Sequence, residues 1–175
     1  TEGGNTRTIY NSISDDYVER TDTVFPDASG ITIFRSVTVE MKQKIEMDRL
    51  LESFNKMRDG LMLWDENNEL MFFNETCGHW NRDSGIALRQ GMKLEEVWGG
   101  FFDQAKLKIG DNHDAFESFT GGLERKAFIN QGTQQFSAED SYTIENPLIN
   151  KYLEVKNTRL PDGVLIATLR DVTDS

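Results

Sequence analysis

The sequence is poor in the residue types that build disulfides and metal sites. Among its 175 residues it has one cysteine, Cys77, and two histidines, His79 and His113. A single cysteine excludes an intramolecular disulfide and is typical of a reducing compartment, so we expect a cytoplasmic protein. Cys77 with His79 is also too small a set for zinc, which needs three or four protein ligands.

Long hydrophobic runs and basic patches are missing as well. No segment approaches the roughly 20 apolar residues of a membrane helix, and the net charge of −11 disfavours binding to nucleic acid or to an anionic membrane surface. The chain starts at Thr1 without a methionine, so we expect a fragment of a longer protein. A membrane anchor elsewhere in that protein is left open.

The motifs of common enzyme classes are absent too. We find no G-x-S-x-G, no H-E-x-x-H and no phosphate-binding loop. A nucleophile also needs an adjacent base and an orienting group, and no such set is recognisable. We therefore expect a chain without catalytic activity whose many carboxylates form a solvated surface.

An internal repeat determines the expected organisation. When the sequence is shifted by 135 residues, residues 8–40 align with residues 143–175 without a gap, and twelve of the 33 aligned pairs are identical. In the second copy, alternating residues 152–160 and 164–172 flank Pro161-Asp-Gly163, which predicts a β-hairpin. Residues 17–25 and 30–37 predict a matching hairpin in the first copy.

A helix is expected between the two copies. Residues 38–58 contain no proline or glycine, and apolar residues recur at steps of three and four. We expect a coiled-coil linker that forms a homodimer, although an amphipathic helix packed on its own domain is the alternative. The residues of the expected seam are Met47, Leu50, Phe54, Met57 and Leu61.

The central region predicts an α+β domain. Two short strands at residues 60–66 and 69–74 precede small helices near residues 76–81 and 94–102. A longer helix is expected at residues 112–129, broken or kinked at Gly121-Gly122, and a third strand near residues 134–142. With the terminal hairpin this gives a five-stranded antiparallel sheet with helices on one face.

These patterns resemble those of the PAS domain family. Gly60, Asp65 and Asn74 occupy the positions of the family's opening motif, and RLPDGVLIATLRDVTDS resembles its closing hairpin with a final Asp-Val-Thr. The resemblance implies a PAS domain at residues 59–175. It also implies that residues 1–37 are the C-terminal strands of an upstream PAS-like repeat, in which Ser36-Val37-Thr38 replaces Asp-Val-Thr.

In this family the last strand passes the signal into a helix that leads to the next domain. The resemblance thus implies signal transmission by Arg170, Asp171 and Thr173, with Asp171 holding a basic group and Thr173 capping the outgoing helix. It also implies neighbouring PAS and output domains in the parent protein. A histidine kinase of a two-component system or a diguanylate cyclase is the expected type.

The ligand of such a domain is not determined by the sequence. We expect Trp64, Phe73, Trp80, Trp98 and Phe116 to line a mostly apolar pocket, although most of these residues simply fill the core. Cys77 lacks the Asn-Cys-Arg context of flavin photoreceptors, and the histidines have no haem-attachment context, so no tightly bound cofactor is expected. A sensor that binds a small molecule or partner and a ligand-free dimerisation and spacer module both fit the sequence.

Overall fold

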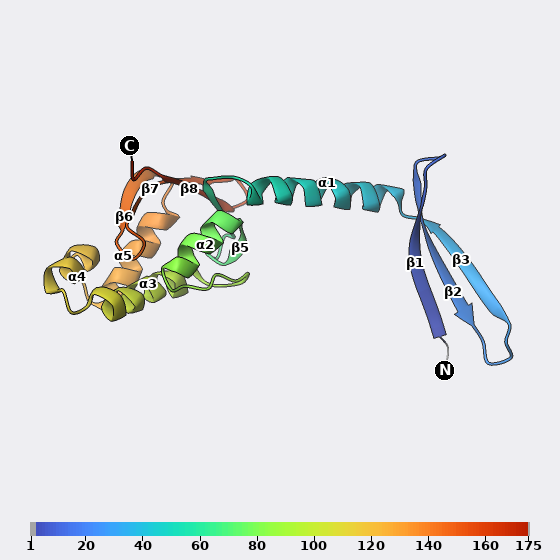
Figure 1. The fold of residues 1–175 in the computed structure, drawn as a ribbon, viewed down its shortest axis with the longest axis horizontal. Coiled ribbons are helices and arrows are strands. Elements are labelled where there is room, and N and C mark those ends of the chain that lie inside the picture. The colour runs from blue at the N-terminus through green and yellow to red at the C-terminus, as the bar shows by residue number, and fades with distance from the viewer. Residues whose placement is uncertain (1–2, 175) are drawn as a thin grey trace. The chain divides into compact units, whose positions relative to one another are not determined.

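The computed structural model describes residues 3–174, and these residues divide into two compact units with the boundary between Glu52 and Ser53. The first unit holds strands β1 (Gly3–Asn11), β2 (Asp16–Val24) and β3 (Gly30–Ser36) and most of helix α1 (Thr38–Asn55). The three strands form an antiparallel sheet in the order β1-β2-β3 (Figure 1).

The predicted N-terminal hairpin is therefore present, but it belongs to a larger sheet. Strand β1 pairs with β2 along its whole length, from Gly3 opposite Val24 to Asn11 opposite Asp16. The sequence did not reveal β1 because its first six residues, GGNTRT, include no apolar side chain that would show the alternation of a half-buried strand.

Helix α1 is shorter than the expected seam. It ends at Asn55, so Met57 lies beyond the helix, and Leu61 lies on strand β4 and is buried. The expectation that these two residues continue the seam is wrong. Their spacing continues the steps of three and four, although the helix ends at Asn55 and β4 begins at Gly60.

The second unit contains the predicted five-stranded antiparallel sheet, in the order β5-β4-β8-β7-β6. Helices α2, α3 and α5 cover one face of this sheet (Figure 1). The strands are β4 (Gly60–Trp64), β5 (Leu70–Phe73), β6 (Ser141–Asn146), β7 (Lys151–Arg159) and β8 (Leu165–Asp171), and the helices are α2 (Glu75–Asp83), α3 (Leu94–Ile109), α4 (His113–Thr120) and α5 (Arg125–Ser137).

The helical region follows the prediction at one point and departs from it at another. As expected, the long helix is broken at Gly121 and Gly122, where α4 is separated from α5; these glycines have φ values of 65° and 71°, which glycine adopts without strain. The expected strand at residues 134–142 is wrong in its first half, because α5 continues to Ser137 and β6 begins only at Ser141. No proline marks the end of α5.

The core lies between the sheet and its helices. Alternate residues of β7 and β8 are fully or almost fully buried, among them Val155, Leu165 and Ala167 at 0% exposure. Trp64 on β4 is also at 0% exposure and meets Phe136 of α5 edge to face, with 6.1 Å between ring centroids. These contacts fix the helices against the inner face of the sheet.

The two sheets share one pairing register. Val18 pairs with Ser36 in the first sheet, and the residues 135 positions later, Leu153 and Asp171, pair in the second. Strands β1 and β2 pair in the same register as β6 and β7. Because register determines which side chains share a face, equivalent residues of the two copies occupy equivalent positions in their sheets.

Candidate functional site

A small cavity lies inside the second unit. Its volume is about 50 Å³, and Trp64, Trp80 and Trp98 line it, together with residues that include Val97, Phe101, Phe136, Ile144 and Leu153. This volume suffices for little more than one or two water molecules. The cavity as it stands is too small for a cofactor of the size of flavin or haem.

Two of the five expected pocket residues do not line this cavity. Phe73 packs against the core and contacts the helix at Gly78, where an added Cβ would lie 3.3 Å from its ring. Phe116 on α4 packs on Phe102 of α3, with 5.5 Å between ring centroids. Phe116 therefore belongs to the contact between α4 and α3 and not to the cavity lining.

Two residues that line the cavity carry buried polar groups without partners. Within the described residues, the indole N–H groups of Trp64 and Trp98 are buried and have no hydrogen-bond partner. An unpaired buried donor costs about 1–3 kcal/mol.

A larger groove lies next to the cavity. Its volume is about 500 Å³, within the range of sites for small molecules. Trp98, Phe101, Ile144 and Asn146 line both the groove and the cavity, so these side chains separate the two spaces. The remaining lining residues come from α4, α5, β6 and the adjoining loops: Ala115, Ser118, Phe119, Thr120, Gly121, Phe128, Gln131, Gly132, Gln135, Thr143, Glu145 and Pro147.

The structure brings two of the three expected transmission residues together at the end of β8. Asp171 accepts a hydrogen bond from the main-chain N–H of Thr173 at 3.0 Å and another from its hydroxyl group. Lys151 at the start of β7 forms an ion pair with Asp171, with 2.6 Å between Nζ and Oδ2. The hydrogen bonds from Lys151 and Thr173 lower the pKa of Asp171 to about 2.

Arg170 does not join this group. Its guanidinium lies 3.2 Å from the carboxylate of Glu154 on the neighbouring strand. Successive residues of a strand point to opposite faces, so Arg170 and Asp171 cannot share one cluster. The sequence did not identify Lys151 as the partner of Asp171. The alignment of the two copies did contain a signal, because Lys151 stands where the first copy has the acidic Asp16.

The hydroxyl group of Thr173 also ties the end of β8 to β7. It accepts a hydrogen bond from the main-chain N–H of Tyr152 at 3.1 Å, and the carbonyl of Tyr152 accepts one from Val172 at 2.9 Å. The same two bonds occur in the first unit, from Tyr17 to Thr38 at 3.0 Å and from Val37 to Tyr17 at 2.9 Å. There α1 begins directly at Thr38.

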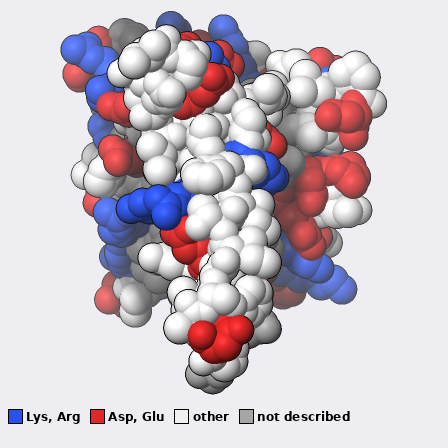
Figure 2. Space-filling model, turned by 90° about the vertical axis from the view of Figure 1, so that its right-hand side faces the viewer, with Lys and Arg blue, Asp and Glu red and all other residues white. Residues whose placement is uncertain are grey.

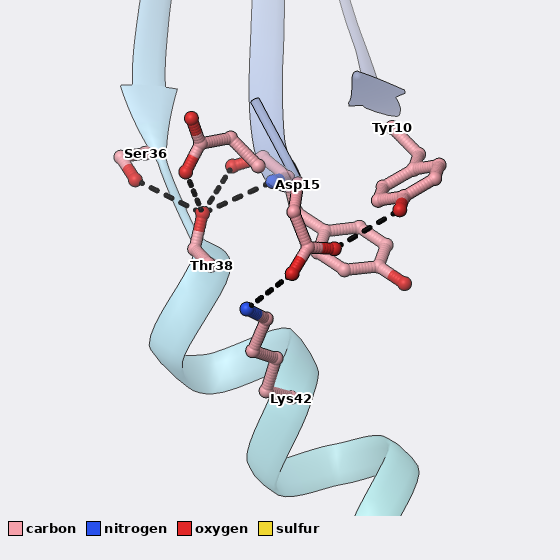
Figure 3. Close-up of polar contacts among 7 residues, drawn as sticks. Tyr10, Asp15, Ser36, Thr38 and Lys42 are labelled. Atoms are coloured by element: carbon pink, nitrogen blue, oxygen red, sulfur yellow. Dashed lines mark hydrogen bonds and ion pairs between the residues drawn. The ribbon is translucent and has the colours of Figure 1, made fainter. Parts of the chain in front are cut away.

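The charges around these Tyr–Thr hydrogen bonds differ between the two copies. Asp16 and Ser36 stand in the first unit where Lys151 and Asp171 stand in the second, so the ion pair of the second copy has no equivalent at these positions. The hydroxyl group of Thr38 contacts Asp16 and Ser36 instead (Figure 3).

The first unit has its own ion pair between sheet and helix. Asp15, in the turn before β2, lies 2.9 Å from Nζ of Lys42 on α1 and accepts a hydrogen bond from the hydroxyl group of Tyr10 at 3.0 Å (Figure 3). The hydrogen bond from Lys42, followed by that from Tyr10, lowers the pKa of Asp15. This contact attaches the first turns of α1 to the β1–β2 turn.

Within the second unit, Asn74 connects the end of α1 to β4 and α2. Its side-chain amide donates hydrogen bonds to the carbonyls of Phe54 and Asp59, both at 2.9 Å. Its Oδ1 accepts from the main-chain N–H groups of Leu61 at 3.0 Å and Cys77 at 3.2 Å, the latter as the N-cap of α2. This fully buried side chain therefore fixes three elements at one point.

The cysteine and the two histidines each have different neighbours. Cys77 is buried, and this burial raises the pKa of its thiol to about 12. His79 lies 3.4 Å from Arg82, and His113 lies 3.8 Å from Glu117. Among the described residues no group of three or more His, Cys, Asp or Glu side chains is arranged to hold a metal ion.

Comparison with known proteins identifies the family. The family model for the PAS fold matches residues 54–175, which is more than half of the chain. The chain belongs to the PAS family. PAS domains are sensory and signalling modules that are in general non-catalytic. The α+β fold with a five-stranded antiparallel sheet and helices on one face is consistent with this family, as the sequence predicted.

Other comparisons add little detail. The structure is similar to the PAS domain of an HTR-like protein from Haloarcula marismortui, with 14% sequence identity and a TM-score of 0.38 over 74% of this chain and 99% of that chain. No curated protein matches the sequence. No helix among the described residues has the length and apolar character that crossing a membrane requires.

Proposed function

We propose that this chain is a sensory relay in which the PAS domain binds a small ligand and passes a conformational change through helical linkers to an output domain. The output domain would follow in the parent protein and would be of the histidine kinase or diguanylate cyclase type. The chain itself would be non-catalytic and cytoplasmic.

The recurrence of one strand-exit geometry carries this proposal. The Tyr–Thr hydrogen bond occurs at Tyr17 and Thr38 and again at Tyr152 and Thr173, and the first of these leads directly into α1. We infer that strands β1–β3 are the C-terminal strands of an upstream PAS-like repeat and that Thr173 starts an equivalent linker. Asp171 and its partner Lys151 would act as positioning residues at this exit.

The linker helix supports a homodimer. No residue of α1 is buried, and Met47 and Leu50 are 55% and 49% exposed. Pairing two α1 helices would remove these side chains from water. In size-exclusion chromatography with light scattering, Leu50→Glu should shift the dimer toward monomer, whereas Lys44→Gln, which changes the net charge equally, should not. A wild-type monomer would contradict the pairing.

Charge argues against two other partners. The net charge is −11, and on the face that Figure 2 shows, basic side chains are scattered between acidic ones. A nucleic acid or an anionic membrane surface requires a concentrated basic area. We therefore propose that neither is a partner of this chain.

The cavity volume of about 50 Å³ favours a second candidate function, a ligand-free dimerisation and spacer module. Native mass spectrometry of the purified chain separates the two. A retained small molecule, or a mass shift on incubation with a metabolite extract, supports the sensor. If the mass stays that of the unliganded chain under both conditions and the dimer is stable, the sensor function is contradicted and the spacer function is supported.

A further inference from the structure

Strand β3 of the first sheet has a free edge. It pairs with β2 from Gly30 to Ser36, and no other strand within residues 3–174 pairs with its second edge. In the second sheet β8 lies between β7 and β4. Because the two sheets share one register, β3 occupies the place of β8, and the place of the strand that corresponds to β4 is open.

The direction of the main-chain groups shows which of them are open. The N–H of Val37, just after β3, donates to the carbonyl of Tyr17 on β2 at 2.9 Å. In an antiparallel strand the main-chain groups of successive residues point to opposite sides. The odd-numbered residues of β3 therefore bond to β2, and the N–H and C=O groups of Thr32 and Phe34 point to the free edge.

The equivalent groups of the second sheet are paired. Ala167 and Leu169 stand 135 positions after Thr32 and Phe34, and their partners across the ladder are Met62 and Gly60 of β4. Positions that carry a ladder in the second copy thus carry unpaired donors and acceptors in the first. An extended backbone satisfies both kinds of group at once, because each of its residues offers one donor and one acceptor.

The edge of β3 also lacks the usual protection. Edge strands are commonly shielded by proline, by lysine or by a bulge. The sequence GITIFRS has neither residue, and its register with β2 is continuous. All seven residues are exposed, and Ile31, Ile33 and Phe34 are each more than half exposed. Such an edge is a template for another strand.

We propose that the free edge of β3 binds an antiparallel strand of the β4 type, supplied by the part of the parent protein that precedes β1. In the second copy β4 likewise precedes β6–β8, and its Met62 and Trp64 are buried in the core. The added strand therefore carries apolar side chains at alternate positions. This inference rests on the proposed upstream repeat and names the segment that completes its sheet beside the start of α1.

Hydrogen exchange at single amides tests the proposal. It is measured in this chain and in the full-length parent protein, by mass spectrometry with electron-transfer fragmentation. We expect the amides of Thr32 and Phe34 to exchange at least roughly a hundredfold more slowly in the parent, because they join a ladder there. The amides of Ile33 and Arg35 bond to β2, so they should be protected in both proteins and serve as the internal reference.

A proline variant tests the direction of these bonds. Thr32→Pro removes an N–H that points to the free edge, a position at which a strand tolerates proline. Thr32→Ala keeps this N–H, and both variants lose the hydroxyl group that donates to Asp22. In this chain the two variants should protect the amide of Ile33 alike, which shows that both sheets fold. In the parent, only Thr32→Pro should speed up exchange at Phe34.

Three results would overturn the inference. Rapid exchange of Thr32 and Phe34 in both proteins would show that the edge stays free. Slow exchange in this chain alone would show that the edge is already filled, by a second copy if the protection grows with concentration. Equal protection of Phe34 in the two parent variants would contradict the added strand. None of these results decides between sensor and spacer, which native mass spectrometry of the chain tests separately.

Discussion

The side-chain amide of Asn74 donates a hydrogen bond to the main-chain carbonyl of Phe54, with 2.9 Å between the two atoms. This bond satisfies a carbonyl in the last turn of α1, which has no partner within the helix. The same side chain binds the start of β4 and the start of α2. Through these bonds, a displacement of the end of α1 would also displace β4 and α2 of the PAS domain.

Replacement of Asn74 should destabilise the domain strongly. Asn74→Ala removes four hydrogen bonds at a fully buried position, and we expect a loss of about 2–4 kcal/mol in the free energy of unfolding. Urea denaturation measures this loss. Asn67→Ala, in the exposed β4–β5 turn, is the matched control and should change it by less than about 0.5 kcal/mol. Equal effects of the two variants would refute the role of Asn74.

The ion pair at the exit of β8 should depend on pH. The pKa of Asp171 is lowered to about 2 in the folded chain, below the value of about 3.9 in an unfolded one. Its stabilising contribution is thus present above about pH 4 and lost as the pH falls toward 2. Because both side chains are 32% exposed, we expect less than about 1 kcal/mol.

The carboxyl ¹³C shift of Asp171 reports this titration directly. The midpoint should lie near pH 2 in the native chain and should rise toward the ordinary aspartate value in Lys151→Met. Lys156→Met removes the same charge at a position away from Asp171 and serves as the control. An ordinary midpoint in the native chain would contradict the ion pair.

The threonine hydroxyl groups should protect the tyrosine amides from hydrogen exchange. Thr173→Val removes the acceptor for the N–H of Tyr152, and Thr38→Val removes that for Tyr17. A lost hydrogen bond of about 1–1.5 kcal/mol corresponds to exchange roughly tenfold faster at that amide. Thr168→Val, in the middle of β8, is the control. Unchanged exchange in both variants would show that the motif does not hold the strand exits.

Cys77 should be inert in the native state. Burial raises the pKa of its thiol to about 12, so almost no thiolate is present at neutral pH. Alkylation by iodoacetamide at pH 8 should proceed only on unfolding, whereas an exposed cysteine introduced by Ser12→Cys should react within minutes. Rapid modification of Cys77 in the folded chain would point to an accessible, reactive thiol.

Most of the strands could be predicted because local chemistry determines them, whereas β1 was missed and β6 was placed too early. Pro161-Asp-Gly163 defines the turn between β7 and β8, and Gly163 has the positive φ of 92° that this turn requires. The repeat then placed the matching hairpin of β2 and β3 in the first copy. The break between α4 and α5 could be predicted for the same reason, since Gly121 and Gly122 stand within an otherwise helical pattern.

The site was less predictable because it depends on contacts between distant segments. Trp98 and Phe116 are both aromatic residues on helices, but only the packing of α3 and α4 in the folded chain decides that Trp98 lines the cavity and Phe116 does not. The groove is lined from three helices and one edge strand. No spacing within a single segment indicates that residues of α4, α5 and β6 line one groove.

An insertion series in α1 tests the central claim, that the linker relays a signal through a fixed helical phase. One residue inserted after Glu46 rotates the following residues by about 100° and moves Leu50 and Phe54 out of register, whereas seven residues nearly restore it. Activity of the output domain is measured in the full-length protein for insertions of one to seven residues. A periodic response, lost at three or four and recovered at seven, is the expected result. A flat response would contradict the relay, and a steady decline would show that α1 packs on its own domain instead.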